Sequence, residues 1–361
     1  MTPDDPRRET PPSGFRELLL EFQQRHRLPA LGGAILTRDG ALHMDVVGVR
    51  IRDGQDPVRL DDRWHVGSCG KSVTAALYAR LVERGEAEWG ARLSDLFPDL
   101  ADTIDRGWSA ISIDDVFVSQ AGLPANPRRA EMLAAWRDAR PIREQRTEIA
   151  ATALARPPRR PGRFLYSNLG YVVIGAAIER ITDLPFESAV GAHVLDPLGI
   201  RSAAFGPPPE LWGHGGRMPA LGPLGLVDLG RGKPADPAEA RSDNPAILSP
   251  AGRLHLGLED WAKFQRVFLW QGGDFLRPET VERLLTPAPG PGQRQAMGWA
   301  SARGLGDASL GQQGSNTYWV ATALIDGARE RTAMVVTNEG RARLLKETPA
   351  LALRLLSEPR G

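Results

Sequence analysis

Ser68 and Lys71, a serine and a lysine three residues apart, form the most chemically suggestive pair in the sequence. The Ala-rich segment 68–84, followed by Gly85, predicts a helix, and residues at positions i and i+3 share one helix face. A serine hydroxyl is a weak nucleophile unless a neighbouring base takes its proton. A lysine can act as that base, whereas arginine cannot give up its proton. The N–H groups at a helix start can also stabilise an oxyanion. The pair therefore indicates acyl transfer, although a single S-x-x-K pattern is also compatible with coincidence.

A second pattern places Tyr166 two residues before Asn168, at the start of the clearest helix in the middle of the chain, predicted over 169–181. A tyrosine hydroxyl can act as a general acid or base beside a serine nucleophile. The chain has only four tyrosines, so the two patterns are rarer together by chance than either one alone. The structural alternative is a core tyrosine with a hydrogen-bonded hydroxyl. We interpret this tyrosine as acting together with Ser68 and Lys71.

The string Gly70-Lys71-Ser72 also matches the end of a phosphate-binding P-loop. That loop requires a glycine five residues before Gly70, where this chain has His65. It also requires a buried apolar strand that leads into the loop, whereas the segment 61–64 is polar. Nucleoside triphosphate binding is therefore disfavoured.

Charge and composition exclude several classes of function. The 361 residues carry 45 basic and 44 acidic side chains, so net charge gives no argument for nucleic-acid binding. The single cysteine, Cys69, excludes an intramolecular disulfide and a multi-cysteine metal site, and the histidines have no metal-ligand spacing. We expect no metal and no cofactor. No apolar run approaches the roughly 20 residues of a membrane span. Residues 1–14 contain four prolines and no signal-peptide core, so we expect a disordered arm. We expect a cytoplasmic location, with a periplasmic or secreted one as the alternative if a leader has been removed.

Apolar periodicity places predicted strands near both ends of the chain and predicted helices between them. The strand-like runs cover residues 31–37, 41–49, 318–325 and 332–337. We expect one helix over 15–27 and another that begins at Thr348-Pro349 and ends near 357. The Gly- and Pro-rich stretch 205–248 is expected to be a surface loop. These elements predict an α+β fold, with an antiparallel sheet built from both chain ends, flanking helices, and an inserted, mostly helical region.

The same pattern predicts how the chain divides into domains. We expect a discontinuous sheet domain of residues 15–95 and 255–361, and a mostly helical domain of residues 96–254. Length alone would also allow two or three independent domains. The sequence has no fixed-period repeat, which disfavours solenoids and propellers.

From about residue 20 to residue 340, the sequence resembles the serine β-lactamase and penicillin-binding-protein superfamily, in particular its branch of class C β-lactamases, DD-peptidases and related esterases. The segments that carry the resemblance are LGGAILTRDG, HVGSCGKSVTAALYARLVE, ISIDDVFVSQAGLP, PGRFLYSNLGYVVIGAAIE, LSPAGRLHLGLEDWAKF and LGQQGSNTYW. The resemblance implies a β-lactamase/transpeptidase-like fold with Ser68 as the acylated nucleophile. It also implies that Lys71 and Tyr166 jointly transfer protons. Asn168 would then hydrogen-bond Lys71 or the substrate amide.

The third motif of this branch, Lys-Thr-Gly or His-x-Gly, is replaced here by Gln312-Gln313-Gly314. By the resemblance, Gly314 lets the substrate pass close to the strand, and the Ser315 N–H is the second oxyanion donor beside that of Ser68. Gln312 cannot supply the charge that would bind a substrate carboxylate. We therefore expect a small ester, amide or peptide-like substrate, with weak β-lactamase or DD-peptidase activity as the second choice. The alternative is a catalytically impaired protein of this fold that binds a ligand or a partner.

Several residues near these motifs are expected to be structural. His65 is interpreted as a packing residue, Cys69 as a small buried side chain, and Asn126 as a loop residue near the site entrance. Tyr318 and Trp319 could line an apolar acyl pocket or belong to the core, and the sequence favours neither.

Overall fold

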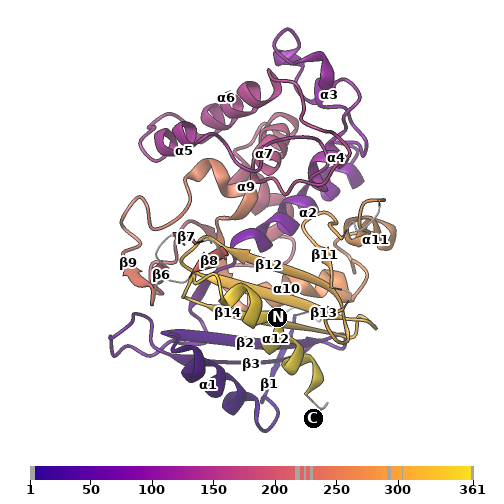
Figure 1. The fold of residues 1–361 in the computed structure, drawn as a ribbon. Helices are drawn as coiled ribbons and strands as arrows, with labels where there is room; N and C mark the ends of the chain where they lie inside the picture. Colours follow the sequence, from indigo (N-terminus) through magenta and orange to yellow (C-terminus); the bar gives the residue numbers. More distant parts are fainter. Residues whose placement is uncertain are drawn as a thin grey trace.

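Strands from both ends of the chain form one sheet, which occupies the lower half of Figure 1. The structure is a computed structural model that describes residues 5–215, 220–222, 225–227, 231–290, 294–302 and 304–358. Within these residues the sheet has seven strands in the order β1-β3-β2-β14-β13-β12-β11. Their bounds are Arg7–Glu9 (β1), Ala30–Thr37 (β2), Ala41–Gly48 (β3), Ala300–Ser301 (β11), Ala308–Ser315 (β12), Val320–Asp326 (β13) and Arg331–Thr337 (β14). The antiparallel pairing of β2 with β14 joins the two chain ends, as predicted.

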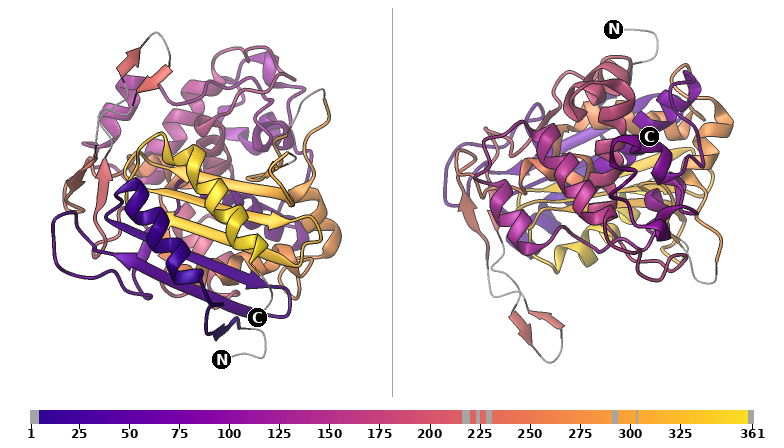
Figure 2. Two further views of the ribbon diagram at one scale, coloured as in Figure 1. Left: turned by 60° about the horizontal axis from the view of Figure 1, so that its bottom comes forward. Right: turned by 90° about the horizontal axis from the view of Figure 1, so that it is seen from above.

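Two helices cover one face of this sheet, as the left panel of Figure 2 shows. They are α1 (Phe15–His26), close to its predicted range, and α12 (Leu344–Ser357). Buried leucines of both helices, including Leu19 and Leu355, pack in one apolar cluster with residues of the sheet. Each such side chain contributes about 1.5–3 kcal/mol by its removal from water. The apolar stripes of the two helices thus fix them to the sheet.

The opposite face of the sheet carries α10 (Leu258–Leu269), and α2 (Gly70–Glu83) lies between the sheet and a helical layer (Figure 1). Helix α2 is buried over almost its whole length, which explains why its sequence has no polar face. The remaining helices are α3 (Leu93–Leu96), α4 (Ile113–Phe117), α5 (Arg129–Ala135), α6 (Ile142–Leu154), α7 (Asn168–Thr182), α8 (Phe186–Val190), α9 (Ser249–Gly252) and α11 (Pro278–Leu285). None of the helices in the described ranges has the length and apolar character that a bilayer span requires.

The stretch 205–248, expected to be a loop, contains short strands instead. They are β5 (Ala204–Phe205), β6 (Gly213–Gly215), β7 (Ala220–Gly222), β8 (Gly225–Val227) and β9 (Lys233–Ala235). Strand β5 pairs with β10 (Leu254–Gly257), which also pairs with β4 (Arg63–His65), directly before the Ser68 segment. Strands of two to four residues are too short to show an alternating apolar pattern, so the sequence gives no indication of them.

The N-terminal segment also differs from the expectation. Residues 7–9, expected to be part of a disordered arm, form β1 and pair in parallel with β3. An unpaired sheet edge offers N–H and C=O groups that an extended segment can satisfy whatever its side chains. Arg8 adds an ion pair with Glu259. Composition therefore could not predict β1. Residues 1–4 of the expected arm lie outside the described residues.

Helix α12 begins at Leu344, before the predicted start at Thr348-Pro349, and it contains Pro349 in its interior. Proline has no N–H to bond to the carbonyl four residues earlier, which belongs to Leu345. Gln313 Nε2 on β12 donates to that carbonyl at 2.7 Å. The strand side chain thus replaces the missing helix bond and ties α12 to β12.

Candidate active site

Ser68 lies in a turn that connects β4 to α2. The turn is a short 3-10 helix, Gly67–Cys69, and α2 begins at Gly70, two residues after the predicted helix start. Gly67 has a φ of 52°, a left-handed conformation that residues with a side chain adopt only at a cost. This sharp turn places the half-buried Ser68 beside the first turn of α2.

Side chains from two distant segments meet at the hydroxyl group of Ser68. Lys71 Nζ donates to Ser68 Oγ at 3.1 Å, and the Tyr166 hydroxyl donates to the same oxygen at 2.8 Å. Lys71 belongs to the first turn of α2, whereas Tyr166 lies two residues before α7. The structure thus brings together Ser68, Lys71 and Tyr166, which the two sequence patterns predict to act together.

Lys71 is 2% exposed, and its ammonium group is fully hydrogen-bonded. Its three N–H groups have three acceptors, which are the serine hydroxyl, Asn168 Oδ1 at 2.7 Å and the Ala251 carbonyl. Nζ also lies 5.0 Å from the ring centroid of Tyr166 and 5.2 Å from that of Tyr171. All these partners are uncharged.

Asn168 is the first residue of α7, and its backbone N–H donates to the Ala125 carbonyl at 2.7 Å. Its side-chain Nδ2 donates to Asn126 Oδ1 at 2.8 Å, which directs Oδ1 toward Lys71. Asn126, expected only to be a loop residue near the entrance, therefore fixes the orientation of the amide that holds Lys71.

Strand β12 passes the Ser68 turn at a distance that only glycine allows. A Cβ atom added to Gly314 would lie 2.0 Å from the Val66 carbonyl oxygen and 2.5 Å from Ser68 N. A Cβ atom added to Gly67 would lie 2.5 Å from Ser315 N. The backbone nitrogens of Ser68 and Ser315 therefore both lie where the turn and the strand are in close contact. Two N–H donors at such a place can stabilise a developing oxyanion.

Gln312 lies two residues before Gly314 on the same face of β12, but its side chain is buried against α10. Gln265 Nε2 on α10 donates to Gln312 Oε1 at 3.4 Å. Within the described ranges, no hydrogen bond connects Gln312 to the serine, the lysine or the tyrosine of the site. The residue that the resemblance aligns with the cation of the third motif is thus a buried, neutral amide.

A buried polar cluster behind the Ser68 turn was not predicted from the sequence. His65 Nδ1 accepts a hydrogen bond from the Gly67 N–H at 3.1 Å, so the ring proton belongs on Nε2. His65 Nε2 lies 3.1 Å from Asp243 Oδ2, and Asn316 Nδ2 donates to Asp243 Oδ1 at 2.7 Å. The residue interpreted as a packing histidine is therefore the centre of a hydrogen-bond network.

This cluster joins the two segments that supply the candidate oxyanion donors. His65 holds the residue before Ser68, and Asn316 directly follows Ser315. Asp243 connects the two side chains. His65 and Asn316 are 251 positions apart, so no motif spacing could indicate that they meet. Their adjacency to motif residues is the only hint that the sequence offers.

The carboxylate of Asp243 remains ionised although it is buried. Burial alone would raise its pKa, but contact with His65, the Arg253 guanidinium and the Asn316 amide together lower the pKa below its ordinary value. A permanent negative charge therefore sits at the centre of the cluster at neutral pH.

Cys69 and Trp319, two other residues near the motifs, are buried. Burial raises the pKa of the Cys69 thiol, which keeps it protonated and unreactive. Trp319 is fully buried and stacks on the His65 ring with centroids 5.4 Å apart, so it belongs to the core. Tyr318 is half-buried, and its hydroxyl donates to the Arg241 carbonyl at 3.0 Å. Over the described part of the chain, no three His, Cys, Asp or Glu side chains are grouped so that they could hold a metal ion.

The chain is similar to one protein family and to several named proteins. Residues 15–356 match the Beta-lactamase family model. Penicillin-binding protein 4 of Amycolatopsis lactamdurans is 25% identical over 263 residues, which are 72% of this chain and 64% of that protein. Esterase EstB of Burkholderia gladioli is 28% identical over 194 residues, 51% of this chain and 50% of that protein. This chain thus spans less than two thirds of the length of these curated relatives.

Solved structures share the fold. A class C beta-lactamase from Rhodobacter sphaeroides matches 95% of this chain and 99% of its own, with a TM-score of 0.73 and 16% identity. This likeness confirms the predicted α+β fold of the β-lactamase/transpeptidase type. Because the family model covers nearly the whole sequence, this chain belongs to the Beta-lactamase family.

Proposed function

We propose that this protein is a serine hydrolase that acts through an acyl-enzyme on Ser68. The observation that carries the proposal is the convergence of Lys71 Nζ and the Tyr166 hydroxyl on Ser68 Oγ, at 3.1 and 2.8 Å. Both groups can exchange protons, and both lie within hydrogen-bond distance of the nucleophile. Membership of the Beta-lactamase family and the likeness to an esterase support the same class of reaction.

In the acylation step, Ser68 Oγ attacks the carbonyl carbon of the substrate while its proton passes to whichever of Lys71 and Tyr166 is deprotonated, as the neutral amine or the phenolate. The resulting oxyanion is stabilised by the N–H groups of Ser68 and Ser315. Its collapse breaks the C–O or C–N bond, and the leaving group takes up the proton that the lysine–tyrosine pair accepted. Asn168 keeps the lysine in place through its bond to Nζ.

In the deacylation step, a water molecule attacks the acyl carbon and gives its proton to the same pair. The second oxyanion uses the same two N–H donors. Its collapse breaks the bond to Ser68 Oγ, which regains a proton, and the carboxylic acid leaves. One proton-transfer pair and one oxyanion site therefore serve both steps.

The surroundings of the site favour uncharged substrates with an apolar group. Phe164 and Leu165 are each 48% exposed and directly precede Tyr166, which is 38% exposed. Adjacent exposed apolar side chains are typical of binding surfaces. Gln312 supplies no charge for a substrate carboxylate. We therefore place carboxylesterase or amidase activity first, and weak β-lactamase or DD-peptidase activity second.

The neutral, buried Gln312 also favours one alternative, a protein of this fold that binds a ligand or partner without turnover. A comparison of p-nitrophenyl butyrate with mono-p-nitrophenyl succinate separates these cases. We expect hydrolysis of both esters to depend on Ser68, with a higher kcat/KM for the butyrate. Hydrolysis equal in wild type and Ser68→Ala would contradict the proposed enzyme, and a preference for the succinate would contradict the proposed substrate class.

A further inference from the structure

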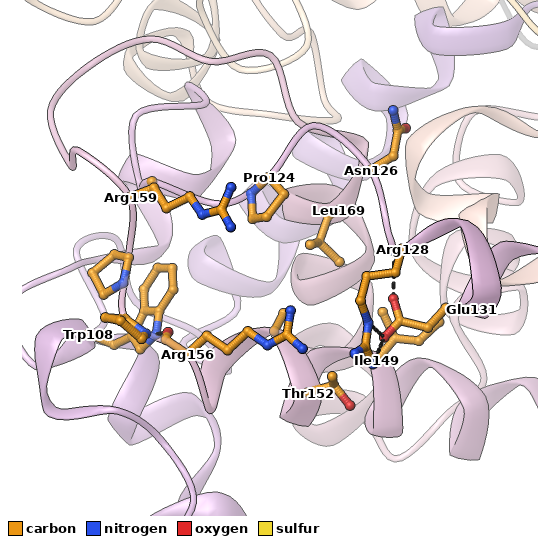
Figure 3. A pocket seen from close by; sticks show the side chains of 14 residues that line it. Trp108, Pro124, Asn126, Arg128, Glu131, Ile149, Thr152, Arg156, Arg159 and Leu169 are labelled. Atoms are coloured by element: carbon orange, nitrogen blue, oxygen red, sulfur yellow. Dashed lines mark hydrogen bonds and ion pairs between the residues drawn. The ribbon is translucent and has the colours of Figure 1, made fainter.

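A pocket of about 490 Å³ lies in the helical region behind the loop 122–126 (Figure 3). Its apolar walls include Trp108, Pro124, Ile149 and Leu169. Asn126 is also at its rim, but Figure 3 shows this side chain pointing away from the pocket. A volume in this range is typical of small-molecule sites.

The pocket carries an excess of positive charge. Arg128 and Glu131 neutralise each other through an ion pair, with Nε 2.7 Å from a carboxylate oxygen. Arg156 and Arg159 form no ion pair with any residue that the structure describes. In Figure 3 both of these side chains extend in the same direction across the pocket from its Trp108 end. Two unneutralised guanidinium groups therefore face an otherwise mainly apolar space.

Hydrogen bonds hold the backbone that carries these two arginines in place. Pro157 and Pro158 separate them and fix two φ angles. Trp108 Nε1 donates to the Arg156 carbonyl at 2.7 Å, and the Arg159 N–H donates to the Gly122 carbonyl at 2.9 Å. Ligand binding would not have to order this segment, which lowers the entropic cost of binding.

We propose that this pocket binds a small organic anion, a carboxylate or phosphate on an aryl or acyl body, and that its occupancy changes the geometry at Tyr166 and Asn168. Guanidinium groups form paired hydrogen bonds with both kinds of anion. Trp108 and the apolar wall opposite contact the body of the ligand. The excess of two positive charges excludes a cationic ligand and disfavours a neutral one.

Two segments of the pocket wall connect the pocket to Tyr166 and Asn168, and we call this connection the coupling. Arg159 lies on the segment that continues to Tyr166, and this segment is held by a bond from the Gly162 N–H to the Gln120 carbonyl at 2.8 Å. On the other side of the wall, Asn126 holds the side chain of Asn168. The coupling rests on the proposed function, whereas the binding site itself does not.

Isothermal titration calorimetry with phenylacetate, phenyl phosphate and the neutral phenylacetamide tests the binding site. The test variant is Arg156→Gln/Arg159→Gln. The matched control is Arg129→Gln/Arg137→Gln, which removes two exposed arginines that do not line the pocket. We expect saturable binding of an anion to wild type and control, about tenfold weaker binding to the test variant, and no binding of the amide. Equal binding to the test variant, or no anion binding to wild type, would overturn the proposal.

Two further measurements place the ligand and test the coupling. Ser68→Ala protein should bind the anion as wild type does, and loss of binding there would place the anion in the catalytic cleft and overturn the separate site. Saturating phenylacetate should change the rate at which a fluorophosphonate labels wild type but not the Arg156→Gln/Arg159→Gln variant. An unchanged rate in wild type would overturn the coupling. Because calorimetry needs no activity, failure of the site and failure of the proposed function are distinguishable.

Discussion

At the scale of single residues, two tyrosine rings lie beside Lys71, and a comparison of the two distinguishes a catalytic role from a packing role. Both rings contact the ammonium group, but only the Tyr166 hydroxyl reaches Ser68. The Tyr171 hydroxyl donates instead to the Phe117 carbonyl at 3.3 Å. We predict that Tyr166→Phe lowers kcat by about 10²–10⁴ because it removes a proton-transfer group. Tyr171→Phe, the matched control, should leave kcat close to that of wild type. Similar kcat values for the two variants would contradict this role of Tyr166.

His65 allows a comparison of two substitutions, because asparagine and glutamine each reproduce one half of the imidazole. His65→Asn keeps an acceptor for the Gly67 N–H, and His65→Gln keeps a donor to Asp243. Since the bond to Gly67 positions the Ser68 turn, we predict that His65→Gln lowers kcat by roughly 10–100-fold with little change in KM. His65→Asn should retain more of the wild-type kcat.

Steady-state kinetics of both His65 variants, with circular dichroism as a check on folding, measure this difference. Equal losses of kcat in the two variants, or a loss confined to KM, would show that the cluster does not position the nucleophile.

The individual residues of the site differ in how far the sequence predicts them. Ser68 and Lys71 are visible in the sequence because one helical turn connects them. Tyr166 is visible because it lies two residues before a strongly periodic helix. Asp243 was not predictable, since it meets His65 only through the tertiary fold and lies in a stretch without periodicity. That the Gln312 side chain turns toward Gln265 depends on packing and is likewise absent from the sequence.

At the scale of elements, β12 is held both by the Ser68 turn and by α12. Gln313 bonds the Leu345 carbonyl, which Pro349 leaves without its helical partner. We predict that Gln313→Ala lowers the free energy of unfolding by about 1 kcal/mol. In a Pro349→Ala background the restored N–H of residue 349 can bond the Leu345 carbonyl instead. Gln313→Ala should then lower the free energy of unfolding by less. Denaturant unfolding of the two single variants and the double variant measures the difference. An equal loss of unfolding free energy in both backgrounds would contradict the view that Gln313 replaces the missing helix bond.

The elements themselves were predictable where they are long and periodic. The hairpin of β2 and β3 and the helix α7 match their predicted ranges to within two residues. Strand β1 was not predictable, because its backbone pairing with β3 does not depend on its side chains, and its ion pair to Glu259 depends on the tertiary fold. The segment Gly311–Ser315 of β12 has neither β-branched nor aromatic residues, so only the resemblance placed it beside the nucleophile.

At the scale of the whole molecule, the pKa values of two buried histidines predict how the free energy of unfolding depends on pH. Burial lowers the pKa of His214 and of His255 to about 4. An unfolded histidine titrates near 6.5, so between pH 6.5 and 4 the unfolded chain binds more protons than the folded protein. Stability should therefore fall as the pH falls through this window, by on the order of 3 kcal/mol for each histidine.

The substitution His255→Asn tests this prediction, because the asparagine amide can still donate to the Gly206 carbonyl that His255 Nδ1 contacts at 2.8 Å. The variant loses the titration, so its free energy of unfolding should change less steeply between pH 6.5 and 4. Urea denaturation at a series of pH values measures the slope. A slope equal to that of wild type would contradict the assignment.

We propose above all that Ser68 is the acylated nucleophile of the molecule. The most direct measurement is intact mass and peptide mapping after incubation with a fluorophosphonate, with Ser72→Ala as the matched control, since the Ser72 hydroxyl is buried and bonded to the Cys69 carbonyl. We predict one adduct on the peptide that carries Ser68 in wild type and in Ser72→Ala, and none in Ser68→Ala. An adduct that persists in Ser68→Ala, or a folded wild-type protein that forms no adduct, would contradict the claim.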